Sequence, residues 1–216
     1  MSKKYLLFDN DGVLVETEPW YLKASQKALK EFFDFTFTKN DYMKLMINGG
    51  SVWQGVEALG ASTQEVNKAR DKRNEYYQEY LKNEDIAIDG VQELLQKLSS
   101  KYKMAIVTTS RRVDFQIIHK NRGIVQYMDF VLCEEDYNFA KPHPEPYLCA
   151  MRKFKASKNE CIVIEDSKRG LSSAVSANID CAIVYNEFTT TQDFSNATYK
   201  INSLNELEKL LENLEK

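Results

Sequence analysis

Two aspartates separated by one residue stand near the amino end of the chain, directly after a short apolar run. Asp9 and Asp11 follow "YLLF", and Gly12 comes next, in a position suited to turn the chain. Side chains of an extended strand alternate between its two faces, so Asp9 and Asp11 are expected to point the same way. Such a pair can supply a nucleophile, a general acid and base, or ligands for a hard cation.

Further polar groups follow later apolar runs. Thr108 comes after "MAIV", Lys141 opens "KPHPEP" beyond "FVL", and Glu165 with Asp166 follow "CIVI". Ligands of open α/β sheets bind beyond the carboxyl ends of the strands, where these groups would meet. Clustered carboxylates repel one another unless a cation neutralises them, and oxygen ligands of this kind suit Mg²⁺. A threonine hydroxyl and a lysine ammonium would hold a phosphate beside it.

Each of these residues also has an ordinary interpretation. Asp-x-Asp-Gly is a good turn sequence, Lys141 alone could be a surface lysine, and Glu165-Asp166 could begin a helix. An EF-hand loop is disfavoured because Gly12 would fall at its fourth position instead of its sixth. All of the groups at successive strand ends, in this order, favour a phosphate and metal site.

The composition excludes several classes of protein. The chain has 216 residues, 43% of them hydrophobic and 28% charged, and its formal net charge is −3. Acids and bases are mixed, so no nucleic-acid partner is expected. There is neither a G-x-x-x-x-G-K-[ST] nor a G-x-G-x-x-G motif, which leaves nucleotide-dependent phosphoryl transfer unsupported.

The cysteines and the apolar runs indicate the cellular compartment in which the protein is expected. The four cysteines are far apart in the sequence and form no C-x-x-C pair, which disfavours a disulfide framework and a zinc site. No apolar run approaches a membrane span, and "YLLF" is too short for a signal peptide. We therefore expect a cytoplasmic protein with no membrane partner, and we expect it to be a monomer.

The apolar runs also predict the fold. Short, unalternated runs at 5–8, 104–107, 130–132, 161–164 and 181–185 resemble strands buried on both faces. Helical segments separate them: Asp89 and Gln92 form a capping-box pair before one, and Ser203 with Glu206 opens the last. The alternation predicts an α/β fold: a Rossmann-like, doubly wound parallel sheet with helices on both faces.

One region breaks the alternation. Residues 17–86 show no convincing strand and four helical segments, the last starting at a Ser62–Glu65 capping box. The basic and acidic stretch "KARDKRNEYYQEYLKNED" within it is interpreted as a solvated helix face. We therefore predict a catalytic core formed by residues 1–16 and 87–216, with residues 17–86 as an inserted four-helix cap.

These motifs resemble the haloacid dehalogenase-like hydrolases, in the branch with a helical cap after the first strand. "YLLFDNDGVLVETE", "IVTTS", Lys141 in "KPHPEP" and "IVIEDSKRG" match its four motifs in order. The resemblance covers essentially the whole chain. It implies that Asp9 attacks phosphorus to form an aspartyl phosphate, and that Asp11 protonates the leaving oxygen and then activates water. It also implies that Mg²⁺ is held by the Asp9 carboxylate, the Asp11 carbonyl and Asp166, with Glu165 nearby.

The substrate should meet loops of both parts. Within "INGGS", Gly49 and Gly50 are suited to a tight loop that approaches a ligand closely. Besides these glycines, the residues expected to bind substrate are Asn10, Tyr21, Thr109, Ser110 and Arg111.

The expected function is a Mg²⁺-dependent phosphatase for a small phosphomonoester such as a sugar or polyol phosphate. A sugar-phosphate mutase of the β-phosphoglucomutase type is the alternative. Family mutases use a histidine near the start of the cap and an arginine in the cap loop. Counting from Asp9, those positions hold Tyr21 and, less securely, Val52. A receiver-like signalling domain is a distant alternative, because receivers are near half this length and lack a cap.

Overall fold

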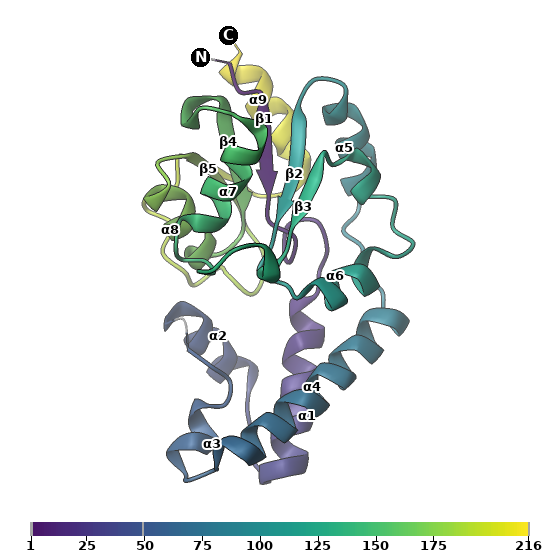
Figure 1. Cartoon of the computed structure of the whole chain (residues 1–216), viewed down its shortest axis with the longest axis vertical. Coiled ribbons are helices and arrows are strands. Elements are labelled where there is room, and N and C mark those ends of the chain that lie inside the picture. Colours follow the sequence, from purple (N-terminus) through teal and green to yellow (C-terminus); the bar gives the residue numbers. More distant parts are fainter. Residues whose placement is uncertain (1, 49, 216) are drawn as a thin grey trace. The chain divides into compact units, whose positions relative to one another are not determined.

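The computed structural model describes residues 2–48 and 50–215, which form two compact units (Figure 1). One unit contains Met1–Glu16 and Ala87–Lys216, and the other contains Thr17–Ile86. The first unit is an α/β domain and the second is helical. The chain leaves the α/β unit shortly after its first strand and returns before the second.

The α/β unit contains a six-stranded sheet in which every pairing is parallel. The strand order is β3-β2-β1-β4-β5-β6, so β1 lies in the interior of the sheet. This sheet, with helices around it, confirms the α/β prediction. The strands are β1 (Tyr5–Phe8), β2 (Lys103–Val107), β3 (Phe130–Leu132), β4 (Cys161–Glu165), β5 (Asp180–Val184) and β6 (Tyr199–Ile201).

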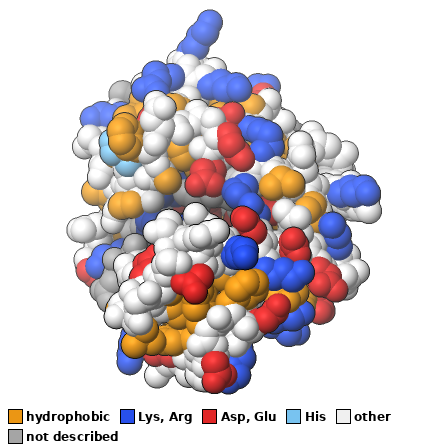
Figure 2. All heavy atoms as spheres, turned by 60° about the horizontal axis from the view of Figure 1, so that its bottom comes forward, with side chains coloured by type: hydrophobic (Ala, Val, Ile, Leu, Met, Phe, Trp, Pro, Cys, Tyr) orange, Lys and Arg blue, Asp and Glu red, His pale blue; other side chains and the backbone are white. Residues whose placement is uncertain are grey.

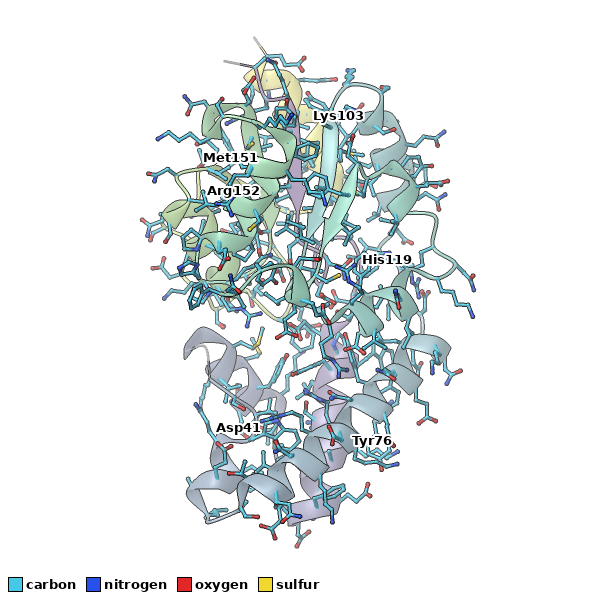
Figure 3. All side chains as sticks on the ribbon, in the orientation of Figure 1. Asp41, Tyr76, Lys103, His119, Met151 and Arg152 are labelled. Carbon is cyan, nitrogen blue, oxygen red and sulfur yellow. The ribbon has the colours of Figure 1, made fainter. Side chains whose placement is uncertain are left out.

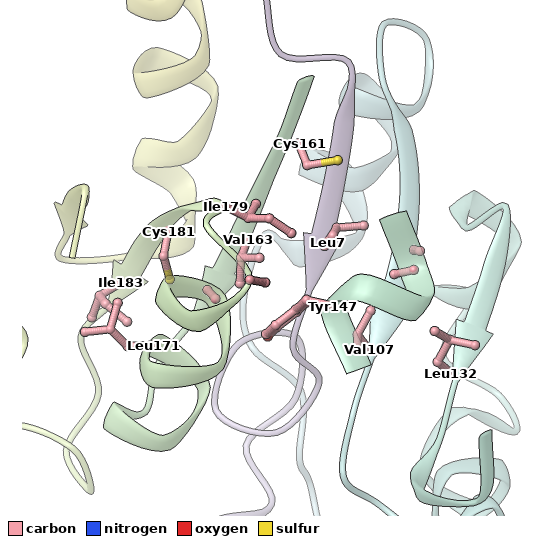
Figure 4. Packing of buried hydrophobic residues seen from close by; sticks show 14 of the residues in the cluster. Leu7, Val107, Leu132, Tyr147, Cys161, Val163, Leu171, Ile179, Cys181 and Ile183 are labelled. Carbon is pink, nitrogen blue, oxygen red and sulfur yellow. The ribbon is translucent and has the colours of Figure 1, made fainter. Parts of the chain in front are cut away.

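Helices cover both faces of this sheet. On one face, α7 (Glu145–Phe154) and α8 (Lys168–Ser176) pack against the buried cluster drawn in Figure 4, which includes Leu7, Val163 and Tyr147. The opposite face is covered by α5 (Val91–Ser99) and α9 (Leu207–Leu214) (Figure 1). A further helix, α6 (Arg112–His119), follows β2. Burial on both faces explains why the central strands are continuous apolar runs.

The helical unit consists of α1 (Glu18–Phe33), α2 (Lys39–Asn48), α3 (Gln54–Ala58) and α4 (Thr63–Asn83). The two long helices, α1 and α4, pack against each other. Ser62 caps α4: its hydroxyl accepts a hydrogen bond from the amide of Glu65, and the Glu65 carboxylate accepts one from the amide of Ser62. That capping box is the one predicted from the sequence.

The sequence prediction was wrong in two local details. Asp89 does not cap α5; Gly90 is the N-cap, with a φ of 79° that an aspartate would adopt only with strain. Strand β6 was not predicted, because its three residues are too few for a pattern and the exposed Lys200 interrupts the apolar run.

Among the described residues, no helix has the length and apolar character needed to cross a membrane. On the face drawn in Figure 2, basic and acidic side chains are interspersed. A broad surface of one charge is not visible on that face.

Candidate active site

The register of the central strands brings three sequence motifs to the same edge of the sheet. Phe8, the last residue of β1, pairs with Ile106 of β2 and Ile164 of β4. Residues just beyond these pairs are therefore neighbours at the carboxyl edge. After β1, the chain turns at Gly12, which has a φ of 78°. A Cβ atom on Gly12 would lie 2.2 Å from Oδ2 of Asp166, so only glycine lets this turn approach the fourth motif so closely.

Lys141 links the first motif to the last. Its Nζ donates hydrogen bonds of 2.7 Å to Oδ1 of Asp9, to Oε1 of Glu165 and to the carbonyl oxygen of Val107. The side chain of Lys141 is only 3% exposed. Its three ammonium hydrogens therefore all have partners, and both carboxylates share one buried positive charge.

Glu165 is buried and fully engaged by hydrogen-bond donors. Oε1 accepts from Lys141 and, at 2.7 Å, from the hydroxyl of Tyr147. Oε2 accepts from the backbone amides of Asp166 and Ser167 and from the Ser167 hydroxyl, at 3.1 to 3.3 Å. Gly170 makes room for this carboxylate, because a Cβ atom there would lie 1.8 Å from Glu165 Cδ.

Burial and the charges of their neighbours shift the pKa values of Asp9, Glu165 and Lys141 in different directions. Burial and the neighbouring Glu165 raise the pKa of Asp9 to about 7, although Lys141 opposes the change. Burial also disfavours ionised Glu165, but Lys141 and the hydrogen bonds outweigh it and hold the pKa of Glu165 below its usual value. Burial would lower the pKa of Lys141, yet the two carboxylates raise it overall. Lys141 and Glu165 therefore form a stable ion pair, whereas Asp9 needs further positive charge to stay ionised.

Asp11 has different partners from Asp9. Its Oδ2 accepts a hydrogen bond of 2.6 Å from the hydroxyl of Ser110 and a longer one of 3.3 Å from the hydroxyl of Thr108. Thr108 Oγ1 in turn accepts from the amide of Ser110, at 3.0 Å. The second motif thus orients the second aspartate, while the lysine contacts the first.

The carboxylates of Asp9, Glu165 and Asp166 form a buried group whose oxygen atoms lie within 4.8 Å of one another. Asn186 Nδ2 donates a hydrogen bond to Asp166 Oδ2 and fixes one side of that carboxylate. Of the two oxygens of Asp9, the described residues give a hydrogen bond only to Oδ1. Oxygen donors without sulfur or imidazole suit a hard divalent cation, and this group fits one.

The predicted substrate-binding residues fall into distinct environments. Ser110 belongs to the cluster, and Thr109 Oγ1 accepts a hydrogen bond of 3.3 Å from Arg169. Arg111 pairs with the buried Asp114, its Nη2 lying 2.6 Å from the carboxylate. The side chain of Asn10 is 0% exposed and its Oδ1 accepts a hydrogen bond from His119, and the contact of Asn10 with substrate stays a prediction.

The remaining predicted contacts belong to the helical unit. Tyr21, on α1, packs its ring against Tyr77 of α4, with ring centroids 5.3 Å apart. Gly50 donates a backbone hydrogen bond to the carbonyl of Leu45. Gly49 lies outside the described residues.

Sequence reasoning assigned no role to Tyr147, Gly170, Asn186 or His119. The position of Gly170 could have been noticed in the sequence. A glycine in the first turn of a helix that follows two acids indicates that another group approaches the helix backbone closely. His119 stands at the end of α6 in Figure 3, far in sequence from its partner Asn10. A pairing of that kind has no local pattern.

A family model described as haloacid dehalogenase-like hydrolase matches residues 6–184 of the chain. The chain belongs to the haloacid dehalogenase-like hydrolase family. It is therefore an enzyme of the hydrolase class, as the four motifs predicted. The polar residues of the four motifs all fall within the matched segment and form the cluster described above: Asp9, Asp11, Thr108, Lys141, Glu165 and Asp166.

Individual members of this family resemble the chain over most of its length. A phosphoglycolate phosphatase from Colwellia psychrerythraea is 29% identical over 189 residues, which cover 83% of each chain. The pyrophosphatase PpaX from Listeria monocytogenes is 31% identical over 179 residues, covering 80% of this chain and 78% of that one. The crystal structure of CbbY from Rhodobacter sphaeroides in complex with phosphate has the same fold, with a TM-score of 0.82, 19% identity, and coverage of 95% and 96%.

Proposed function

We propose that the chain is a Mg²⁺-dependent phosphatase that hydrolyses a small phosphomonoester, such as a sugar or polyol phosphate, through an aspartyl phosphate on Asp9. The observation that carries this proposal is the different surroundings of two aspartates two residues apart. Asp9 contacts a buried ammonium and lies in the acidic group, whereas Asp11 accepts hydrogen bonds from two hydroxyls. Environments that separate two carboxylates in this way assign them different catalytic roles.

Asp9 supplies the nucleophile in this proposal. Lys141 occupies Oδ1 and orients the carboxylate, which leaves Oδ2 to attack phosphorus. The P–O bond to Asp9 forms as the bond to the leaving alkoxide breaks. Because the pKa of Asp9 is near 7 with Lys141 alone, ionisation of Asp9 depends on a second positive charge.

Asp11 transfers the protons. It donates a proton to the leaving oxygen, and its carboxylate then takes a proton from the water that attacks the aspartyl phosphate. The Ser110 hydroxyl, 2.6 Å from Oδ2, keeps the carboxylate in position for both steps. Thr108 completes the pair of hydroxyls and can also donate to a phosphoryl oxygen.

Asp9, Asp166 and the backbone carbonyl of Asp11 would hold Mg²⁺. Bound there, the ion would supply positive charge to the phosphoryl oxygens and to Asp9. Glu165 belongs to the same geometric group, but its two oxygens already accept five hydrogen bonds, more than their roughly four lone-pair sites. We therefore assign Glu165 to Lys141, as its counter-ion, and not to the metal.

The names of the relatives support the reaction class and leave the substrate open. Phosphoglycolate phosphatase and pyrophosphatase act on different small phosphate compounds by their names, and both support phosphate hydrolysis here.

The test is release of phosphate from para-nitrophenyl phosphate by the wild type, Asp9→Asn and Asp11→Asn. Asp9→Asn should abolish turnover, because an amide does not form the acyl phosphate. Asp11→Asn should lower kcat by roughly 10²–10⁴-fold, the usual contribution of general acid–base catalysis. Near-wild-type turnover by Asp9→Asn would refute the nucleophile.

The metal is tested in the same assay. Activity should require Mg²⁺ and be suppressed by Ca²⁺, because the larger ion accepts bidentate carboxylates and would engage both oxygens of Asp9. Equal rates with both ions, or full activity in excess chelator, would exclude this use of the metal.

A further inference from the structure

The loop that follows β5 contacts the fourth motif at two points. Asn186, which lies just beyond the end of β5, donates a hydrogen bond from Nδ2 to Oδ2 of Asp166. Further along the loop, Oε1 of Gln192 accepts a hydrogen bond of 2.6 Å from the backbone amide of Lys168, the first residue of α8. Phe188, between these two contacts, is buried. The loop is therefore anchored on both sides of the short segment that begins with Asp166.

The hydrogen bonds of the Asn186 side chain fix the orientation of its amide group. Oδ1 accepts a hydrogen bond of 2.9 Å from the backbone amide of Phe188 and one of 3.2 Å from the hydroxyl of Thr189, which is 1% exposed. A backbone amide can only donate, so the side-chain oxygen must face Phe188 and the NH₂ group must face Asp166. Asn186 is therefore preorganised as a hydrogen-bond donor to one oxygen of the Asp166 carboxylate.

The turn of the first motif packs against the same contact. A Cβ atom on Gly12 would lie 2.2 Å from Oδ2 of Asp166 and 2.7 Å from Nδ2 of Asn186. Asp166 itself is only 4% exposed. Its carboxylate has little room to rotate, because rotation would break the bond to Asn186 and move an oxygen against the backbone of Gly12. The chain therefore sets the orientation of this proposed metal ligand before a cation binds.

A donor fixed on one oxygen of Asp166 affects which divalent cation the acidic group accepts. Mg²⁺ demands a nearly ideal octahedral geometry, and the two oxygens of one carboxylate lie too close together to occupy neighbouring octahedral positions. Ca²⁺ is larger, takes more oxygen ligands and accommodates both oxygens of a carboxylate. The hydrogen bond from Asn186 to Oδ2 competes with such chelation but is compatible with coordination through a single oxygen. The arrangement therefore favours the smaller ion.

We propose that Asn186 is a positioning residue that makes the site selective for Mg²⁺ over Ca²⁺, by holding Asp166 to coordination through one oxygen. The inference rests on the proposed metal-dependent phosphatase function and adds to it a determinant of metal choice that lies outside the four motifs. The amide of Asn186 suits this role because it donates a hydrogen bond without adding charge. A carboxylate in its place would add an oxygen ligand and favour the ion with the higher coordination number.

The experiment measures the Kd values of Mg²⁺ and Ca²⁺ by calorimetric titration of the metal-free wild type and of Asn186→Leu. Leucine removes the donor and keeps water from replacing it. Mg²⁺ binding should weaken about tenfold or more, the usual effect of losing a hydrogen bond to a metal ligand. Ca²⁺ binding should stay the same or tighten, because both oxygens of Asp166 can then chelate the ion. An unchanged ratio of the two Kd values would overturn the proposal, since a merely structural residue would weaken both ions alike.

Asn196→Leu is the matched control, because Asn196 is an exposed asparagine between β5 and β6. It should keep the wild-type ratio, and a change equal to that of Asn186→Leu would refute the assignment to Asn186. Should Asn186→Leu not fold, Asn186→Ala removes the same donor with a smaller side chain and is judged by the same ratio.

The proposed function and this inference fail in different ways. Binding of Mg²⁺ to the wild type that is weakened in Asp166→Asn is established first, and its absence would refute the metal-dependent function together with the inference. If that binding is present and the ratio does not depend on Asn186, only the selectivity role is refuted. Inhibition gives a second readout: at a fixed Mg²⁺ concentration, the Ca²⁺ concentration that halves phosphate release should be about tenfold lower for Asn186→Leu than for the wild type. Equal concentrations would contradict the proposal.

Discussion

The side chains of Asn10 and His119 are joined by a hydrogen bond of 2.7 Å between Oδ1 and Nε2, inside the α/β unit. Burial lowers the pKa of His119 to about 4, so the ring is neutral at physiological pH and donates from Nε2. Asn10 lies between the two aspartates, and the bond thus ties the motif loop to α6. Nδ2 of Asn10 and Nδ1 of His119 are buried with no partner among the described residues.

We predict that the double variant Asn10→Leu/His119→Leu loses less free energy of unfolding than the sum of the losses in the two single variants. Each single change leaves one buried polar group without its partner, which costs about 1–3 kcal/mol. Replacing both removes the polar groups together, so the double variant should lose less free energy of unfolding than the sum. Urea denaturation of the four proteins measures the coupling. Strict additivity would mean that the bond contributes nothing.

The lowered pKa of His119 should also make the free energy of unfolding decrease at acidic pH. Its folded pKa of about 4 lies below the ordinary value near 6.5, so between these values the unfolded chain takes up a proton that the folded protein refuses. Stability is unaffected above about pH 6.5 and is lost as the pH falls toward 4, by on the order of 3 kcal/mol. The His119→Leu curve should be flatter over this window than the wild-type curve. Parallel curves would contradict the assignment.

The assignment of Glu165 to Lys141 predicts different effects for two adjacent acids. Asp166→Asn should weaken Mg²⁺ binding by at least about tenfold, because it removes a charged oxygen ligand. Glu165→Gln should change Mg²⁺ affinity less and lower kcat instead, since Lys141 and Asp9 lose their alignment. Calorimetric titration of both variants, beside their kinetics, separates the roles. A larger loss of affinity in Glu165→Gln would make Glu165 a ligand.

The raised pKa of Asp9 predicts that Mg²⁺ binding releases a proton from its carboxyl group. Because its pKa is raised to about 7, the carboxyl is largely protonated in metal-free protein below that pH, and the cation binds only the ionised form. Calorimetry in buffers of different ionisation enthalpy should show release approaching one proton at about pH 6 and little at about pH 8. Asp9→Asn is the control and should release none. Equal release at both values would place the proton elsewhere.

The sequence predicted those site residues that can be recognised from their own type and from the apolar run directly before them. Asp9 and Thr108 directly follow buried strands and Glu165 is the last residue of another, and the alternation of strand and helix places those strand ends together. The type of each residue and its position after an apolar run were sufficient. The bond between Asn10 and His119 was not predictable, because it joins segments that only the fold brings together.

Arg73 is a different case, since a signal was present. The stretch around it was interpreted as a solvated helix face because acids and bases alternate there. However, Val66, Ala69, Tyr77 and Leu81 recur at helical spacing and place position 73 on the buried side. Periodicity decides burial more reliably than local charge.

The last prediction separates hydrolysis from phosphoryl transfer to a second hydroxyl. The position at which family mutases have a histidine holds Tyr21, whose ring packs against Tyr77 and the Arg73 guanidinium. A phenol does not exchange protons near neutral pH as imidazole does. Water should therefore be the acceptor.

Sugar monophosphates are supplied with a catalytic amount of the bisphosphate, and free phosphate and isomerised sugar phosphate are measured together. Phosphate release should exceed isomer formation throughout. Tyr21→His, which restores an imidazole at that position, should raise the proportion of isomer without abolishing hydrolysis. Isomer formed faster than phosphate by the wild-type protein would instead identify a mutase.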